Sequence, residues 1–121
     1  MQRSSPNSAG ATYLDKPRRI DELRQAARRA QTRVPSIERM ILFGSFAAGT
    51  PTPRSDADIL VVVDTSTERA SRDRVPALLQ AMSPLPCPVD LFVLTNDELA
   101  RAQREADALV REALASGIEL L

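Results

Sequence analysis

The sequence contains no histidine, no tryptophan and a single cysteine, Cys87, and each of these shortages excludes a class of protein. One cysteine rules out a disulfide framework. Without histidine, neither a zinc site of the usual ligand types nor a Ser-His-Asp triad can be built. Any metal ion bound here must therefore be a hard cation held by oxygen, because carboxylates are the ligands that remain.

Long hydrophobic runs are also absent. No segment approaches the roughly 18 consecutive apolar residues that a membrane-spanning helix needs. The polar residues 1–12 lack the apolar core of a secretory signal, and we interpret them as a disordered tail. We therefore expect a cytoplasmic protein with one domain over residues 13–121 and no membrane partner.

What the sequence does contain is sufficient for one folded domain, with 121 residues of which 43% are apolar. The formal net charge of zero conceals an asymmetry. Residues 1–54 carry ten Arg or Lys and four Asp or Glu, whereas residues 55–121 carry six and twelve. Neither half combines strong basicity with aromatic residues, so we do not expect a nucleic acid as a direct ligand.

The spacing of apolar residues predicts alternating helices and strands. A helical stripe follows Asp15 and Pro17, which suit a helix start, and ends at residues 34–36. A capping box at Thr95 and Glu98 opens one long helix that ends near Gly117. The other predicted elements are strands at 40–43, 57–63 and 89–94, a helical turn at 46–48, and a helical segment at 68–82 that breaks or begins afresh at Pro76. Residues 118–121 form either a short edge strand or a docked end. The fold class is therefore α/β or α+β, with a small mixed sheet and helices packed on it.

Three aspartates stand in or beside these strands. Asp56 and Asp58 bracket the start of one strand and point to the same face, with their Cα atoms about 6.5 Å apart. Like charges side by side in this way repel each other. Asp90 lies in an apolar strand, where an unpaired charge is costly. A divalent cation, Mg²⁺, would relieve both problems. As alternatives, Asp56 can cap a turn, Asp58 can be a solubilising residue at the edge of its strand, and Asp90 can pair with Arg39 or Arg54.

Gly44 and Ser45 sit between a predicted strand and a helical turn. Glycine lets a backbone approach a ligand closely, and the amides at a helix start can bind phosphate together with a serine hydroxyl. A Gly-Ser pair alone is usually an ordinary turn. Its significance comes from the Asp-x-Asp pattern that follows ten residues later.

Together these segments resemble the signature of the DNA polymerase β-like nucleotidyltransferase superfamily, and in particular the minimal nucleotidyltransferases of prokaryotes. The resemblance covers residues 35–100, and Asp90 matches the third carboxylate strand of that family. The motif segments are Gly44-Ser45-Phe46-Ala47-Ala48-Gly49 and Ser55-Asp56-Ala57-Asp58-Ile59-Leu60-Val61-Val62.

The resemblance implies a nucleotidyltransferase fold and a metal-dependent reaction. Asp56, Asp58 and Asp90 would be the catalytic residues and the ligands of two Mg²⁺ ions, while Gly44 and Ser45 would hold the phosphates of ATP. Family members often carry a basic residue where this chain has Ala48, and Arg54 could take over that role. With all three aspartates intact, we expect an active enzyme.

The resemblance also implies an acceptor. Minimal nucleotidyltransferases resemble antitoxins that transfer AMP from ATP to a tyrosine of a helical HEPN-type toxin. Two alternatives remain open: an antitoxin that only binds its toxin and retains a vestigial metal site, and a transferase acting on a small molecule such as an antibiotic. One helix face is a candidate partner or phosphate surface, although an ordinary solvated face is the favoured interpretation. That face carries Arg24, Arg28, Arg29 and Arg33.

Overall fold

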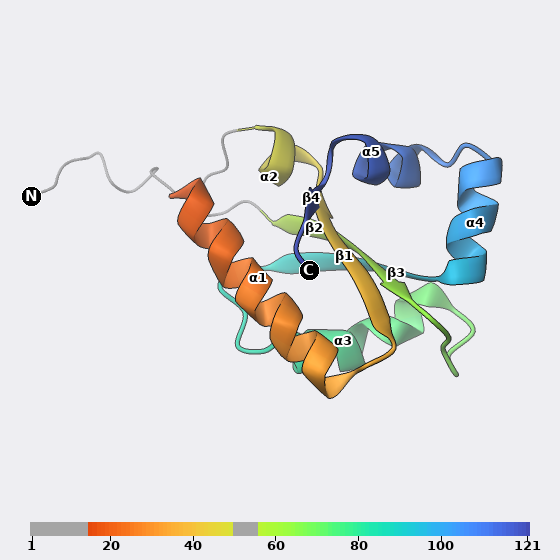
Figure 1. Cartoon of the computed structure of the whole chain (residues 1–121), viewed down its shortest axis with the longest axis horizontal. Helices are drawn as coiled ribbons and strands as arrows, with labels where there is room; N and C mark the ends of the chain where they lie inside the picture. Colours follow the sequence, from red (N-terminus) through yellow and green to blue (C-terminus); the bar gives the residue numbers. More distant parts are fainter. Residues whose placement is uncertain (1–14, 50–55) are drawn as a thin grey trace, which may run out of the picture.

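A computed structural model describes residues 15–49 and 56–121 of the chain, which are built around one four-stranded sheet (Figure 1). The strand order is β3-β2-β1-β4, where β2 pairs antiparallel with β1 and parallel with β3. The strands are β1 (Ile37–Phe43), β2 (Ala57–Val63), β3 (Val89–Thr95) and β4 (Ile118–Glu119). The predicted mixed sheet is therefore confirmed, although β1 begins at Ile37, before the predicted start at residue 40. Of the two alternatives for 118–121, the structure has the short edge strand.

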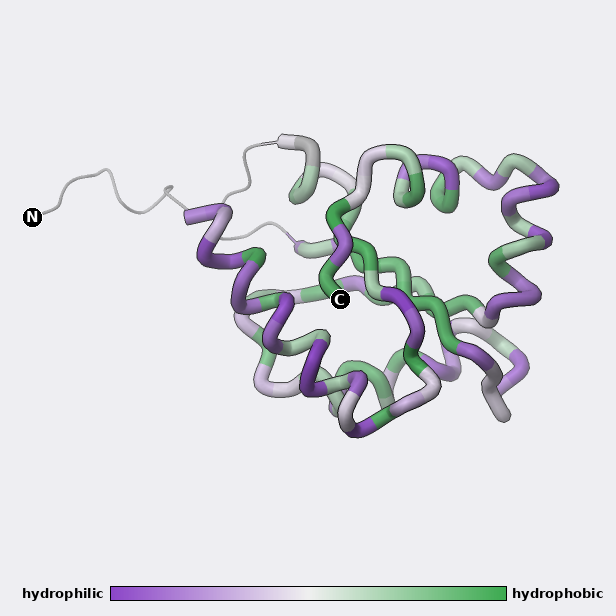
Figure 2. The backbone as a smooth tube through the Cα atoms, viewed as in Figure 1, coloured by the Kyte–Doolittle hydropathy of each residue, from purple (hydrophilic) through white to green (hydrophobic). Residues whose placement is uncertain are grey.

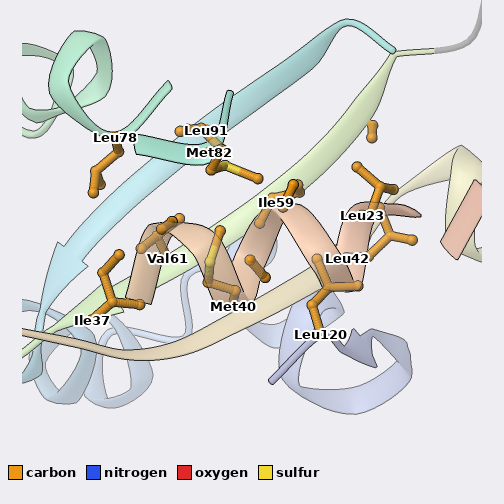
Figure 3. Close-up of a cluster of buried hydrophobic side chains, with 14 of the residues drawn as sticks. Leu23, Ile37, Met40, Leu42, Ile59, Val61, Leu78, Met82, Leu91 and Leu120 are labelled. Atoms are coloured by element: carbon orange, nitrogen blue, oxygen red, sulfur yellow. The ribbon is translucent and has the colours of Figure 1, made fainter. Parts of the chain in front are cut away.

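Helices cover both faces of the sheet (Figure 1). The larger core lies between the sheet and two of the helices, and Figure 3 shows its side chains, among them Leu23, Ile59 and Leu78. These helices are α1 (Lys16–Arg33) and α3 (Val75–Met82). The smaller core, which includes Leu60 and Val110, lies on the opposite face of the sheet, under α4 (Asn96–Arg104) and α5 (Ala108–Ser116).

Local capping signals place two helix starts where the sequence predicts them. The Asp15 carboxylate accepts the Arg18 amide at 3.2 Å, and a proline follows in the first turn of α1. At α4, the Thr95 hydroxyl and the Glu98 carboxylate both accept backbone amides, which forms the predicted capping box. Much of α1 is hydrophilic, while β2 and the later part of β1 are hydrophobic (Figure 2).

The prediction of one continuous helix after Thr95 is wrong. The chain breaks between α4 and α5, where Ala106 has a φ of 54° and Asp107 caps the new helix by accepting the Val110 amide at 3.0 Å. The segment at 68–82 also starts later than predicted. It contains a short 3-10 helix, η2 (Ser71–Arg74), followed by α3, which has Pro76 in its first turn. The predicted new start at Pro76 is confirmed, because a proline suits the first turn of a helix.

Among the described residues, none of the helices combines the length and hydrophobicity needed to cross a bilayer.

Candidate functional site

The register of the sheet brings two of the predicted aspartates together. β2 and β3 are parallel, and Asp58 is aligned with Asp90. Neighbouring strands lie about 4.8 Å apart, and residues aligned in register point to the same face. That face is the one under α4 and α5, since Leu60 and Phe92, two residues further along each strand, pack in its core. The two carboxylates therefore share one corner of the sheet.

Asp56 precedes β2 by one residue and lies two residues before Asp58, so strand alternation directs it to the same side. Asp56 and Asp90 are exposed, whereas Asp58 is partly buried. The prediction of a costly charge within an apolar strand is therefore wrong for Asp90, because it is the second residue of β3 and lies where the strand begins. Its suggested partner Arg39 instead pairs with Glu119 at 2.6 Å.

Gly44 lies directly against the Asp58 carboxylate. It follows Phe43, the last residue of β1, which is paired with Asp58 across the antiparallel ladder. Its φ of 77° and ψ of −159° are essentially restricted to glycine. A Cβ atom at Gly44 would stand 2.5 Å from Oδ2 of Asp58. Both the backbone conformation and the close approach therefore require glycine here.

Ser45 opens the single-turn helix α2 (Ser45–Ala48) and is exposed. The turn leads away from the end of β1 (Figure 1) and ends at Gly49, whose amide donates to the Ser45 carbonyl at 2.8 Å. The predicted helical turn stopped by Gly49 is confirmed. Ala48 is its last residue. Arg54 lies outside the described residues, so its phosphate contact stays a prediction.

The electrostatics of the corner are unfavourable for Asp58. Its pKa is raised, first by burial and then by the negative charges of Asp90, Asp56 and Glu112. Glu112 comes from α5 and carries no sequence signal that could have placed it here. Four carboxylates from three segments thus contribute negative charge to one place.

The residues present fit Mg²⁺ by their chemistry. All are hard oxygen ligands, and Mg²⁺ binds through one or two carboxylates while water and substrate phosphates complete its shell. Within residues 15–49 and 56–121, no three His, Cys, Asp or Glu side chains stand close enough together to enclose a metal ion by themselves. Water and substrate phosphate oxygens are the further ligands that Mg²⁺ takes at such sites.

The arginine face of α1 has a structural role that the sequence did not reveal. Arg29 donates to the Met82 carbonyl at 3.0 Å and to the Pro84 carbonyl at 2.6 Å. Arg33 donates to the carbonyls of Ala81 and Ser83 at 3.1 and 3.2 Å. These contacts satisfy backbone groups at the end of α3, as basic side chains often do at helix C-termini. Arg29 and Arg33 thus hold α3 against α1.

Comparisons with known proteins give the following findings. The family model described as nucleotidyltransferase domain matches residues 23–116. A candidate nucleotidyltransferase from Sulfolobus solfataricus has a similar structure, with 22% sequence identity, a TM-score of 0.60, and coverage of 86% of this chain and 80% of that chain. At this level of identity the likeness shows the fold alone, which confirms the predicted fold class.

Two toxin–antitoxin crystal structures were also found. A variant of MntA-HpeT has 21% identity and a TM-score of 0.49, covering 89% of this chain and 73% of that chain. A toxin–antitoxin with AMP-PNP has 24% identity and a TM-score of 0.47, again covering 89% and 73%. A search of curated proteins found no match.

Proposed function

This chain belongs to the nucleotidyltransferase domain family, and on that premise we propose that it transfers a nucleoside monophosphate, AMP from ATP, to a hydroxyl group. One observation carries the proposal. Gly44 lies so close to Asp58 that no side chain fits between them, and Asp58 is aligned with Asp90 on the next strand. The turn proposed to bind phosphate and the Asp58 carboxylate are therefore neighbours.

Each residue at this corner has a role in the proposed reaction. Gly44 lets the backbone approach the triphosphate, and the Ser45 amide and hydroxyl donate to its oxygens. Asp90 orients the acceptor hydroxyl and accepts its proton. The acceptor oxygen forms a bond to the α-phosphorus, the bond from that phosphorus to the bridging oxygen breaks, and pyrophosphate leaves. Arg54 is the proposed additional phosphate ligand.

Asp56, Asp58 and Asp90 would hold Mg²⁺. The motif resemblance implies that they hold two ions. When bound, the metal supplies positive charge that neutralises the phosphate oxygens and orients the attacking and leaving groups. The raised pKa of Asp58 is consistent with this role, because a cation removes the repulsion between carboxylates that the free protein must tolerate.

For the acceptor, we propose a tyrosine of a small helical HEPN-type toxin, so that the protein acts as an antitoxin. The motif resemblance of residues 35–100 is the basis for this choice. The exposure of Asp56 and Asp90 supports it, since a site open at the sheet edge can be reached by a residue of another protein.

The test uses purified protein, Mg²⁺, ATP radiolabelled at the α-phosphate, and the protein encoded next to this one as acceptor. We expect label on the acceptor, at least about 10²-fold less of it with Asp56→Ala, the range for losing a group that stabilises developing charge, and no loss with Asp97→Ala. Asp97 is a suitable control because it is an exposed carboxylate in the first turn of α4, beyond the other end of β3.

Other results would redirect the proposal. Toxin neutralisation that survives combined Asp56→Ala and Asp58→Ala substitution would identify a binding antitoxin with a vestigial metal site. Transfer to an aminoglycoside without a protein acceptor would identify a small-molecule transferase. Competition by CTP and GTP in the same assay measures the choice of nucleotide.

A further inference from the structure

Lys16 is the only lysine in the chain, and it makes two contacts far from its own position in the sequence. Its ammonium group donates to the Ala47 carbonyl at 2.8 Å and to the Gly49 carbonyl at 3.0 Å. These carbonyls belong to the last part of α2 and the residue that ends it. The first turn of α1 is therefore tied to the turn that follows Gly44 and Ser45.

The position of Lys16 disagrees with local helix preferences. It is the first residue of α1, where a positive charge opposes the helix dipole, and the first turn contains no acidic residue. A residue that breaks a local rule is often retained for a contact elsewhere in the fold. Here that contact is with the carbonyl groups of α2, which lie 31 and 33 residues away along the chain.

α2 needs such external support. It is a single turn of four residues, closed at its end by the bond from the Gly49 amide to the Ser45 carbonyl, at 2.8 Å. One isolated helical turn is unstable, because it fixes several residues for a single hydrogen bond. Burial of Phe46, which is 1% exposed, anchors the inner side of the turn. Lys16 holds its outer end through the carbonyls of Ala47 and Gly49.

We propose that Lys16 is a positioning residue for nucleotide binding: it holds α2 in place so that the Gly44 and Ser45 backbone meets the triphosphate in a fixed orientation. The inference rests on the proposed function of that turn. Lys16 acts through α2 and needs no contact with the nucleotide. Its ammonium group is a compact charge with three donors, which suits two convergent carbonyl oxygens.

The test compares Lys16→Met, which retains the aliphatic stem, with Arg18→Met. Arg18 lies in the same helical turn, is exposed, and makes no side-chain hydrogen bond or ion pair within residues 15–49 and 56–121. Exchange of the Gly49 amide is measured by NMR, and binding of ATP with Mg²⁺ by calorimetry. In Lys16→Met we expect Gly49 exchange to accelerate about tenfold, equal to about 1.4 kcal/mol, and Kd for ATP to rise about fivefold. Exchange of the Val61 amide in the central strand stays unchanged.

Kinetics and a conservative variant separate positioning from general damage. KM for ATP rises in Lys16→Met while kcat at saturating ATP stays within about twofold, the pattern of a lost ground-state binding contribution. Lys16→Arg, which keeps the charge and its donors, recovers most of the affinity.

The two proposals fail in different ways. If the wild-type protein binds ATP and Lys16→Met binds it equally well, or if Arg18→Met weakens binding as much, the role of Lys16 is overturned and the proposed function stands. If the wild-type protein binds no nucleotide, the proposed function fails and the inference fails with it, even where Gly49 exchange responds to Lys16→Met.

Discussion

Charged side chains at the two ends of the sheet are arranged in opposite ways. Where β3 ends, Arg74 is 6% exposed and donates to both carboxylate oxygens of Glu98, at 2.5 and 3.1 Å. It also donates to the carbonyls of Glu68, Arg69 and Val93. Where β2 and β3 begin, several carboxylates gather, and their repulsion contributes to raising the pKa of Asp58.

The difference separates charges that stabilise the fold from charges that serve a site. Arg74 and Glu98 satisfy each other, and hydrogen bonds from Arg74 and Thr95 lower the pKa of Glu98 to about 2. Asp58 gains nothing comparable and its pKa moves in the unfavourable direction. A cluster that costs stability in the free protein is what a binding site for a cation and phosphates requires.

Removing the buried cation should have the largest effect on stability. Arg74→Met removes a donor from Glu98 and from the carbonyls of Glu68 and Arg69, while the Val93 carbonyl keeps its bond from the Ser71 hydroxyl. We expect a loss of about 3 kcal/mol, because the lost hydrogen bonds include those of a charged group with a partly buried carboxylate. Urea unfolding followed by circular dichroism measures it. Arg104→Met, an exposed position in α4, is the control. A loss no greater than that of the control would show that the charges at this end of the sheet are not stabilising.

At the opposite end, Gly44→Ala should cost about 2 kcal/mol, because the methyl group must occupy a strained backbone region and displace the Asp58 carboxylate. Gly49→Ala is the matched control. The φ of Gly49, −111°, is normal for alanine, and the added Cβ atom would lie 3.0 Å from the Ser45 carbonyl oxygen. Equal unfolding free energies for the two variants would contradict the strain at Gly44.

Asp58→Asn should change stability in the opposite direction. A raised pKa means that the folded state disfavours the charged carboxylate, so the penalty is present at pH 7 and disappears with the charge. We expect a gain of up to about 1 kcal/mol. Excess Mg²⁺ should raise the Tm of the wild type more than that of Asp58→Asn, because a ligand of the folded state stabilises it. Equal wild-type midpoints with and without Mg²⁺ would argue against the metal site.

The smallest expected effect is the acid dependence of Glu98. Its pKa falls from 4.5 unfolded to about 2 folded, so its contribution is complete above pH 4.5 and is lost as the pH falls towards 2. Because the Glu98 side chain is 36% exposed, solvent screening limits the contribution to below about 1 kcal/mol. Glu98→Gln keeps the capping geometry and should remove this pH dependence, which unfolding measurements from pH 5 to 2.5 can detect.

Local signals explain which parts of the fold could be predicted. Asp15 and Thr95 cap helices through backbone amides within three residues, so their roles can be read directly from the sequence. The break between α4 and α5 was missed because Ala106 adopts a positive φ without being glycine. Asp107, a residue type favoured at helix starts, was the available signal.

The candidate site could be predicted only in part, because some of its features follow from strand pairing and others from packing. The alignment of Asp58 with Asp90 follows from parallel pairing of two predicted strands, whereas the exposure of Asp90 depends on where β3 begins. The contacts of Arg74 with Glu98 and of Lys16 with α2 span 24 and more than 30 residues. No periodicity encodes such pairs, because they form only once the elements pack.

The carboxylate corner shares its sheet face with the smaller of the two cores, the one formed with α4 and α5. Segments with less buried apolar area open locally at lower free energy than the rest of a protein. Partial unfolding that releases α5 would thus disperse Glu112 and uncover Phe43 while α1 and α3 stay folded on the other face. On gradual heating or in mild denaturant, loss of the site is then expected to precede loss of the sheet, as the first of two cooperative steps.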